Sequence, residues 1–296
     1  MEALPQLIVN GLVAGSMYSL AAIGYAMVYS ILKFPNFANG SLAMIGAYLT
    51  FVLFTRLGMN VAIALILSML ISALLGVILD KVAYRPLRAR RAPKINVLIT
   101  AMAASFVLDG MVLLLMGAEY HRFAFPVVRG VRLGTIFITP VQIICILVSV
   151  ALMLGLHFLL TRTTIGKSIR AVADNPELAA INGLNSENVI SVVFALGSIL
   201  AAVAGSLIGM DTVLSPTMGF AITIRGFAAC VLGGLGSING AILGSIIMGM
   251  GENLGVWFLA GGDARWKIAF AYLIMMLILL LRPAGILGKK GEARVF

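Results

Sequence analysis

Two short stretches rich in Gly, Pro and Asn interrupt otherwise apolar sequence. Phe34–Gly40 reads FPNFANG and Gly233–Gly240 reads GGLGSING. Pro35 lacks a backbone donor and disfavours helix at the residue before it. Non-helical backbone at membrane depth persists only where it is buried in protein or lines a wet cavity, and paired interruptions of this kind point to a transport site. A plain turn between helices is the alternative for each stretch. The candidate pathway residues are Pro35, Asn36, Asn39, Gly40, Asp109, Gly234, Gly236 and Asn239.

Three ionisable residues lie inside or at the start of apolar runs: Asp109, Arg225 and Glu252. A charge at the centre of a membrane helix costs about 2.5–3.5 kcal/mol on insertion scales, so each needs a reason. For Arg225 and Glu252 we expect a structural ion pair or a position near the membrane interface. Asp109 fits a pathway residue and a structural residue equally well. No series of acids indicates a proton relay.

The polar segment 162–187 reads RTTIGKSIRAVADNPELAAINGLNSE. Asp174–Glu177 is typical of a helix start, with a side-chain cap, Pro at the first position and an acid in the first turn. The predicted helix, Pro176–Ile181, ends at Asn182–Gly183, which is a C-cap pattern. A short capped helix between two membrane spans is a suitable docking surface for a soluble partner, with Ala179 on its small, partner-facing side. The alternative is a solvated loop containing one turn of helix.

Catalytic and metal chemistry find little support. The chain has two His, His121 and His157, and it contains no HExxH, GxSxG or Walker A motif. An intramembrane enzyme would need a paired nucleophile and base. We therefore expect no catalytic residues and no metal site, and any ATP must be hydrolysed by another chain. Cys145 and Cys230 lie in apolar segments and are expected to be small buried hydrophobes.

The elements that position these residues are long apolar segments. The chain has 296 residues, of which 61% are hydrophobic and 11% charged, whereas soluble domains carry about 25% charged residues. A bilayer core about 30 Å thick needs roughly 20 apolar residues per helix. The sequence predicts an all-α bundle of eight or nine membrane segments forming one transmembrane domain over residues 1–296, with broken or re-entrant helices. The segments are approximately 6–32, 40–54, 60–79, 95–117, 139–161, 188–209, 221–236, 238–258 and 266–282.

Loop charge predicts the orientation. The net charge is +10, and most positive residues lie in short loops, which indicates a membrane topology rather than nucleic-acid binding. Loop 80–94 holds six of the 21 Lys and Arg residues and is expected to be cytoplasmic. Segment 162–187 lies two crossings later, on the same side, and the basic tail (Lys289, Lys290, Arg294) is expected there too. Loop 118–138, with Arg122, Arg129 and Arg132, falls outside, as does the N-terminus. An inside tail requires three crossings after residue 209, or a re-entrant segment near 221–240.

Small residues recur at a spacing of four. Such faces let membrane helices approach closely, so they indicate a compact bundle and a dimer face. The pairs and triplets are Gly11/Gly15, Gly205/Gly209, Gly236/Gly240/Gly244 and Gly251/Gly255.

Long blocks of this sequence match a known pattern. They are NGLVAGSMYSLAAIGYAMVYSILKFPNFANGSLAMIGAYL (10–49), YRPLR (84–88), GKSIRAVADNPELAAINGLNSENVI (166–190), GFAACVLGGLGSINGAILGSIIMG (226–249) and LRPAGILG (281–288). Nearly end to end, the chain resembles the integral membrane permease subunit of branched-chain amino acid ABC importers, the LivH type. The blocks separate this type less sharply from relatives that import urea or other small polar solutes.

The resemblance implies an ABC importer permease that translocates branched-chain or similar hydrophobic amino acids by alternating access in a bacterial or archaeal cytoplasmic (inner) membrane. It implies a related permease subunit, in a heterodimer or a homodimer, two cytoplasmic ABC ATPase subunits that bind ATP and Mg, and a periplasmic or surface-tethered solute-binding protein. This chain itself is expected to bind no cofactor and no nucleic acid. The ATPase-docking residues implied are Gly166, Arg170, Ala171, Asp174, Asn175, Pro176, Glu177, Leu178, Ala179 and Gly183.

One position departs from the family pattern. Asn39 stands in NFANG where the family often has His in NFAHG. This argues against a pH-sensitive role there and leaves the exact solute open. The alternatives are a urea or other small polar solute permease of the same superfamily, or a stand-alone channel or secondary carrier. A channel or carrier has no need for a capped docking helix at 166–183.

Overall fold

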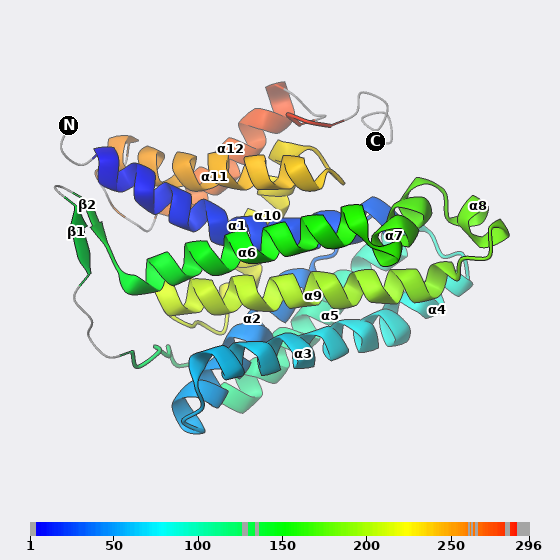
Figure 1. Cartoon of the computed structure of the whole chain (residues 1–296), viewed down its shortest axis with the longest axis horizontal. Coiled ribbons are helices and arrows are strands. Elements are labelled where there is room, and N and C mark those ends of the chain that lie inside the picture. The colour runs from blue at the N-terminus through cyan, green and yellow to red at the C-terminus, as the bar shows by residue number, and fades with distance from the viewer. Residues whose placement is uncertain are drawn as a thin grey trace.

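The protein is a bundle of long helices, with a small β-hairpin at one end (Figure 1). The computed structural model describes residues 4–125, 130–133, 136–259, 261, 263, 266–281 and 285–288. The helices are α1 (Leu4–Leu32), α2 (Ala38–Phe51), η1 (Val52–Arg56), α3 (Val61–Leu79), η2 (Asp80–Tyr84), α4 (Arg85–Ala89), α5 (Lys94–Met116), α6 (Pro140–Arg162), α7 (Thr164–Asp174), α8 (Pro176–Ile181), α9 (Ser186–Asp211), α10 (Met218–Gly233), α11 (Ile238–Leu259) and α12 (Lys267–Leu281). The strands β1 (Val131–Leu133) and β2 (Ile136–Ile138) pair antiparallel, with Arg132 opposite Phe137.

The nine predicted apolar segments all form helices. Seven helical stretches among the described residues are long and apolar enough to cross a membrane: Leu4–Leu32, Ala38–Arg56, Val61–Ala89, Lys94–Met116, Pro140–Arg162, Ser186–Asp211 and Ile238–Phe258. The other two, α10 and α12, are shorter, at 16 and 15 residues. The predicted multi-pass helical membrane protein is therefore confirmed.

The bundle has two distinct ends, which we call the α8 end, where α7 and α8 lie, and the hairpin end, where β1 and β2 lie (Figure 1). The link between α9 and α10 lies at the hairpin end, and the link between α10 and α11 lies beside α7 at the α8 end. After α12, the backbone N–H of Ile286 donates to the carbonyl of Leu232, so the chain has returned to the α8 end. The sequence left two arrangements open after residue 209, three crossings or a re-entrant segment near 221–240. The structure shows three passes along the bundle.

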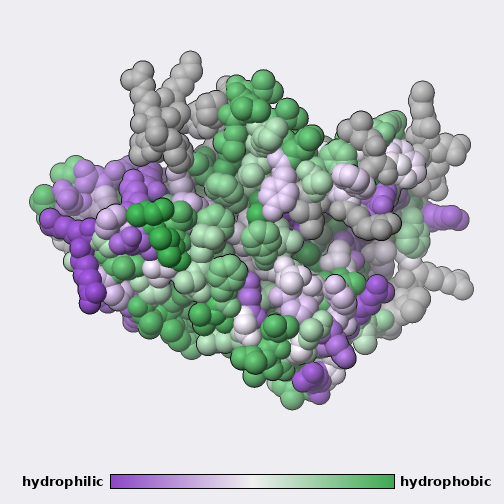
Figure 2. All heavy atoms as spheres, turned by 180° about the vertical axis from the view of Figure 1, so that it is seen from behind, coloured by the Kyte–Doolittle hydropathy of each residue, from purple (hydrophilic) through white to green (hydrophobic). Residues whose placement is uncertain are grey.

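Helices α1, α2 and α9 form the centre of the bundle. Of the 18 most apolar consecutive residues in each of these spans, 67% are buried. In the spans of α3, α5 and α6 the buried share is only 17–22%. The outer helices therefore expose apolar side chains to their surroundings, as a membrane requires. Figure 2 shows this: hydrophobic residues cover much of the middle of the molecule, and hydrophilic residues gather at the α8 end.

The central helices approach one another through glycine. Gly40 of α2 lies against α10, where an added Cβ would collide with the backbone of Gly219 and the side chain of Thr223. Gly11 and Gly15 of α1 lie against the backbone of α11, at Met250 and Ile246. The predicted compact bundle is confirmed, and Gly11 and Gly15 serve packing within the chain, because α11 covers them.

Candidate functional site

The first helix break is shorter than predicted. It covers the residues between α1 and α2, and Asn39 and Gly40 already belong to the first turn of α2. Just before this start, Oδ1 of Asn36 accepts hydrogen bonds from the backbone N–H of Ala38 (3.2 Å) and from the hydroxyl of Tyr84 (2.7 Å). The bond to Ala38 satisfies the N–H of the first residue of α2, which is one of the donors that a helix start leaves free.

Both asparagines of this stretch are buried inside the bundle. Asn36 is 2% exposed and Asn39 is 4% exposed. Asn39 donates from Nδ2 to the carbonyl of Ala21 on α1 at 3.3 Å. The described residues Phe34–Gly40, Pro35 among them, line neither of the two cavities described below.

The second break, between α10 and α11, is built from glycines with positive φ. Gly234 has φ 110° and Gly236 has φ 83°, a region that residues with a Cβ rarely adopt. The hydroxyl of Ser237 accepts from the backbone N–H of Gly240 at 3.1 Å, so α11 begins at Ile238. Asn239 and Gly240 are therefore helical, as the predicted segment 238–258 requires, and the non-helical break is shorter than the stretch Gly233–Gly240.

Asp109 lies outside both breaks, but its side chain interacts with Ser41 in the first turn of α2. It lies on α5, four residues after Ser105, whose carbonyl accepts from the hydroxyl of Ser41 on α2 at 3.4 Å. Residues four apart share one helix face, so Asp109 is on the side of α5 that meets α2. Its Oδ1 is buried and makes no hydrogen bond with any described residue. Asp109 lines neither cavity.

The segment predicted to carry a docking helix holds two helices. α8 has the predicted bounds, and Oδ1 of Asn175 accepts from the backbone N–H groups of Glu177 and Leu178 at 3.0 Å each. Gly183, at φ 82°, ends it. α7 was not predicted from the sequence, although Thr163 caps it by accepting from the backbone N–H of Gly166 at 3.1 Å. The buried pair Ile169 and Val172, three residues apart, is the helical pattern that could have identified it.

The exposed face of α8 is not the predicted one. Ala179 is only 4% exposed and packs in the core of its own chain, whereas Leu178 is 57% exposed and Ile181 is 80% exposed. The expectation that Ala179 faces a partner is therefore wrong. Large apolar side chains at the free end of a helix are available for contact with another protein.

Hydrogen bonds and ion pairs connect α8 to the spans. The hydroxyl of Ser186 donates to the carbonyl of Pro176 at 3.0 Å. Arg88 lies between two carboxylates, with Nη2 2.7 Å from Glu187 Oε2 and Nη1 2.7 Å from Asp80 Oδ1. Asp80 is fully buried and also accepts from the hydroxyl of Ser191 at 2.8 Å.

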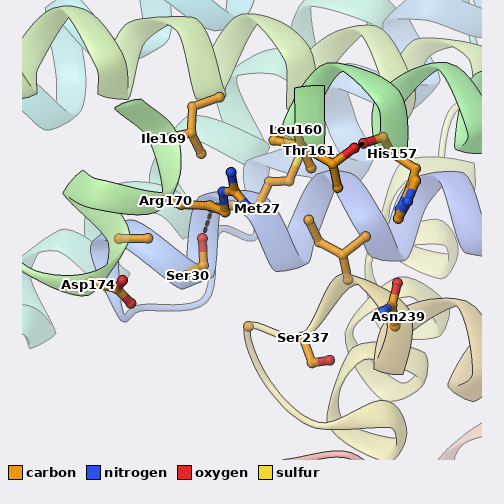
Figure 3. Close-up of a pocket in the computed structure, with 13 residues that line it drawn as sticks. Met27, Ser30, His157, Leu160, Thr161, Ile169, Arg170, Asp174, Ser237 and Asn239 are labelled. Carbon is orange, nitrogen blue, oxygen red and sulfur yellow. Dashed lines mark hydrogen bonds between the residues drawn. The ribbon is translucent and has the colours of Figure 1, made fainter. Parts of the chain in front are cut away.

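A cavity of about 350 Å³, the inner cavity, lies at the α8 end (Figure 3). Figure 3 shows that α7 contributes Arg170 and Asp174, and the start of α11 contributes Asn239. The cavity thus joins two groups of predicted residues, one from the pathway and one from the docking segment. Its lining residues are Met27, Ser30, His157, Leu160, Thr161, Ile169, Arg170, Ala173, Asp174, Gly236, Ser237, Ile238 and Asn239.

The expected structural ion pair is present. Arg225 Nε lies 3.1 Å from Glu252 Oε1, and the hydroxyl of Tyr18 donates to Glu252 Oε2 at 3.0 Å. The guanidinium carbon of Arg225 is 5.5 Å from the centre of the Tyr18 ring. The Glu252 side chain is fully buried, so the pair and the tyrosine together compensate its charge.

Arg129 and the basic tail residues Lys289, Lys290 and Arg294, which were used to predict orientation, lie outside the described residues. The basic loop 80–94 and the segment 162–187 both lie at the α8 end, next to each other through Arg88 and Glu187. This is consistent with the prediction that both are on one side of the membrane.

A bundle of apolar helices with two helix breaks, buried ion pairs and capped helices at one end is the architecture of a multi-pass membrane protein. Residues 7–279 match the family described as branched-chain amino acid transport system / permease component. The chain belongs to this family. It is a transport permease, as the resemblance implied.

The relatives agree along nearly the whole chain. The chain is 37% identical to the high-affinity branched-chain amino acid transport system permease protein BraD of Pseudomonas aeruginosa over 98% of this chain and 97% of BraD. It is 33% identical to the corresponding protein LivH of Escherichia coli K12, over 97% of this chain and 96% of LivH. The fructose import permease protein FrcC of Rhizobium meliloti is 34% identical, but over only 47% of this chain and 39% of FrcC.

A solved structure shares the fold. One chain of PsaBC from Streptococcus pneumoniae in complex with Fab is similar at a TM-score of 0.50 and 13% identity, covering 96% of this chain and 93% of that chain. At this identity the likeness concerns the arrangement of helices alone.

Proposed function

We propose that this chain is the transmembrane permease subunit of an ABC importer that translocates branched-chain or similar hydrophobic amino acids by alternating access. The observation that carries the proposal is the nearly full-length likeness to BraD and LivH, which are both named for branched-chain amino acids. The match to the fructose permease covers less than half of this chain. The amino acid reading is therefore favoured over a permease for another small polar solute.

The exposed face of α8 supports the proposal that the ATPase subunits bind at the α8 end. At the α8 end, Leu178 and Ile181 form an exposed apolar face, the docking face, on a helix that is capped at both ends. Contacts from α8 through Ser186 reach the Arg88 network inside the bundle. Two partner ATPases would bind and hydrolyse ATP, and movement of α7 and α8 with them would act on the spans through these contacts.

The remaining partners follow from the same assignment. The importer core would consist of this chain and a second permease subunit, either related or identical, and a solute-binding protein would deliver the amino acid at the hairpin end. The hydrophilic α8 end with its basic loops would face the cytoplasm. The assembly would lie in the cytoplasmic membrane of a prokaryote, as one transmembrane domain with its docking segment at 162–187.

The test is transport in proteoliposomes. The chain is reconstituted with its partner permease, ATPases and binding protein, and uptake of radiolabelled leucine is measured with and without ATP. We expect ATP-dependent uptake, and loss of ATPase association and uptake in Leu178→Asp, because this change places a charge in the apolar docking face.

Tyr120→Asp is the matched control. Tyr120 is 75% exposed and lies beyond α5, towards the hairpin end, so the same change there should leave ATPase association intact. Uptake that needs no ATP, or full ATPase association in Leu178→Asp, would contradict the importer and favour a channel or carrier.

A further inference from the structure

A second cavity, the outer cavity, lies at the hairpin end. Its volume is about 500 Å³, which is within the range of roughly 300–1,000 Å³ usual for small-molecule sites. It is formed by α1, α9, α10 and α11, by the link between α9 and α10, by Lys267 at the start of α12, and by Gln142 of α6. It lies at the opposite end of the bundle from the inner cavity.

The lining of the outer cavity changes from exposed to buried. Asp211 and Thr217 are exposed, whereas Met17, Ile222 and Asn253 are buried at 3%, 3% and 7% exposure. The cavity therefore extends from the surface of the bundle into its interior. Its inner part has apolar side chains on the wall and polar groups among them.

Charges of both signs line this cavity. Arg225 lies on α10 and keeps 15% of its side chain exposed, while its partner Glu252 is fully buried and is not among the lining residues. Asp211, at the end of α9, and Lys267 contribute opposite charges nearer the surface. A solute with one charge would meet both attraction and repulsion, whereas a zwitterion could satisfy both.

Arg225 is prepared to bind a carboxylate. Its contact with Glu252 uses Nε, and a guanidinium carries five N–H donors, so the group has donors for a second acceptor. The pair with Glu252 and the ring of Tyr18 holds the guanidinium in one place. Arg binds carboxylates in a planar, two-point geometry, which adds direction to the interaction.

Acceptors for an ammonium group are also present. Asn253 donates from Nδ2 to the carbonyl of Gly249 at 2.8 Å, so its Oδ1 is the atom left to accept. Asp211 contributes carboxylate oxygens, which are also acceptors, nearer the surface. Met17 and Ile222 supply apolar surface between these polar groups.

We propose that the outer cavity is a subsite for the zwitterionic head of a hydrophobic α-amino acid. Arg225 would hold the carboxylate, Asp211 and Asn253 would receive the ammonium group, and Met17 and Ile222 would contact the apolar side chain. The inference rests on the proposed function, and it assigns to Arg225 a role beyond its ion pair.

The experiment measures leucine binding to the permease itself. The complete transporter, without the binding protein, is placed in nanodiscs, and radiolabelled leucine binding is measured. Leucinamide, which lacks the carboxylate, is the competitor. We expect leucine to bind and leucinamide to compete poorly. In the double variant Arg225→Gln with Glu252→Gln, which removes both charges together, we expect leucine binding to weaken about ten-fold or more.

Two further variants sharpen the test. The control is Thr50→Val with Ser206→Ala, which removes another buried side-chain contact (2.9 Å between the hydroxyls) away from the cavity and should leave leucine binding unchanged. Asp211→Asn changes an exposed residue and should weaken leucine binding several-fold. It tests the subsite independently if the double variant Arg225→Gln with Glu252→Gln fails to assemble.

Failure of this inference is distinct from failure of the proposed function. The subsite would be overturned if the wild-type complex bound no leucine, even where its uptake is normal. It would also be overturned if binding were unchanged both in the double variant Arg225→Gln with Glu252→Gln and in Asp211→Asn. A wild-type transporter that imports no hydrophobic amino acid when the binding protein is present would instead overturn the proposed function.

Discussion

The hydroxyl of Tyr84 lies 2.7 Å from Oδ1 of Asn36, and this hydrogen bond joins η2 to the break that precedes α2. The same π-helix begins at Asp80, which is bound by Arg88. π-Helical turns are frequent at functional sites. One short element thus contacts both the break and the network that reaches α8.

Removing the Tyr84 hydroxyl should weaken this connection. In Tyr84→Phe we expect a loss of stability of about 0.5–1.5 kcal/mol, the net contribution of one hydrogen bond, together with reduced uptake per ATP hydrolysed. Thermal unfolding and the ratio of leucine uptake to ATP hydrolysis measure the two effects. Tyr25→Phe is the control, because the buried Tyr25 hydroxyl has no hydrogen-bond partner among the described residues. Equal ratios in the two variants would show that the contact has no part in coupling.

Arg88 should matter for stability more than its neighbours in the basic loop. Arg88→Ala leaves the fully buried Asp80 without its cation, and breaking a buried pair costs about 3–5 kcal/mol. We expect a large fall in the thermal midpoint of the purified protein. Arg90 is exposed, and Arg90→Ala should leave the midpoint nearly unchanged. A similar midpoint for both variants would contradict the role of the network.

The two faces of α8 should respond differently to the same charge. Ala179→Asp buries a carboxylate within the chain itself, so we expect loss of a monodisperse permease in size-exclusion chromatography. Ile181→Asp places the charge on the exposed docking face, so the permease should remain monodisperse while ATPase association is lost. The opposite pattern would reverse the assignment of the faces.

Close packing of α2 on α10 should make Gly40 intolerant of substitution. In Gly40→Ala the new Cβ would collide with Thr223 and Gly219, and overpacking of this kind costs about 1–3 kcal/mol. Gly110 on α5 is a matched control, because a Cβ there would meet nothing within 4 Å. Gly110→Ala should be neutral or stabilising by up to about 1 kcal/mol. Thermal unfolding of the two variants decides the point.

The orientation can be tested at the end of α4. Ala89 is exposed in the basic loop, and the two native cysteines, Cys145 and Cys230, are buried and should give little background. In Ala89→Cys we expect no labelling by an impermeant thiol reagent added to intact cells, and labelling once the membrane is opened. Ready labelling of intact cells would reverse the topology.

Features that depend on neighbours in the chain could be predicted from the sequence. The nine apolar segments were recognised because a bilayer demands a minimum length of apolar residues. The bounds of α8 followed from Asn175, Pro176 and Gly183, since caps act on backbone groups within a few residues of themselves. An isolated charge in an apolar helix is costly, so a structural pair of Arg225 with Glu252 was one of the two expectations, beside a position near the interface.

Features that depend on distant residues were decided only by the tertiary structure. The sequence could not show that Ala179 faces inwards, because Leu178, Ala179 and Ile181 are all apolar and the surrounding helices decide which of them is covered. It could not show that Asn36 is bound by Tyr84, which lies 48 positions away in the chain. The outer cavity brings together Met17, Asp211 and Arg225 from three helices. Such contacts arise from packing between helices, which local sequence patterns do not encode.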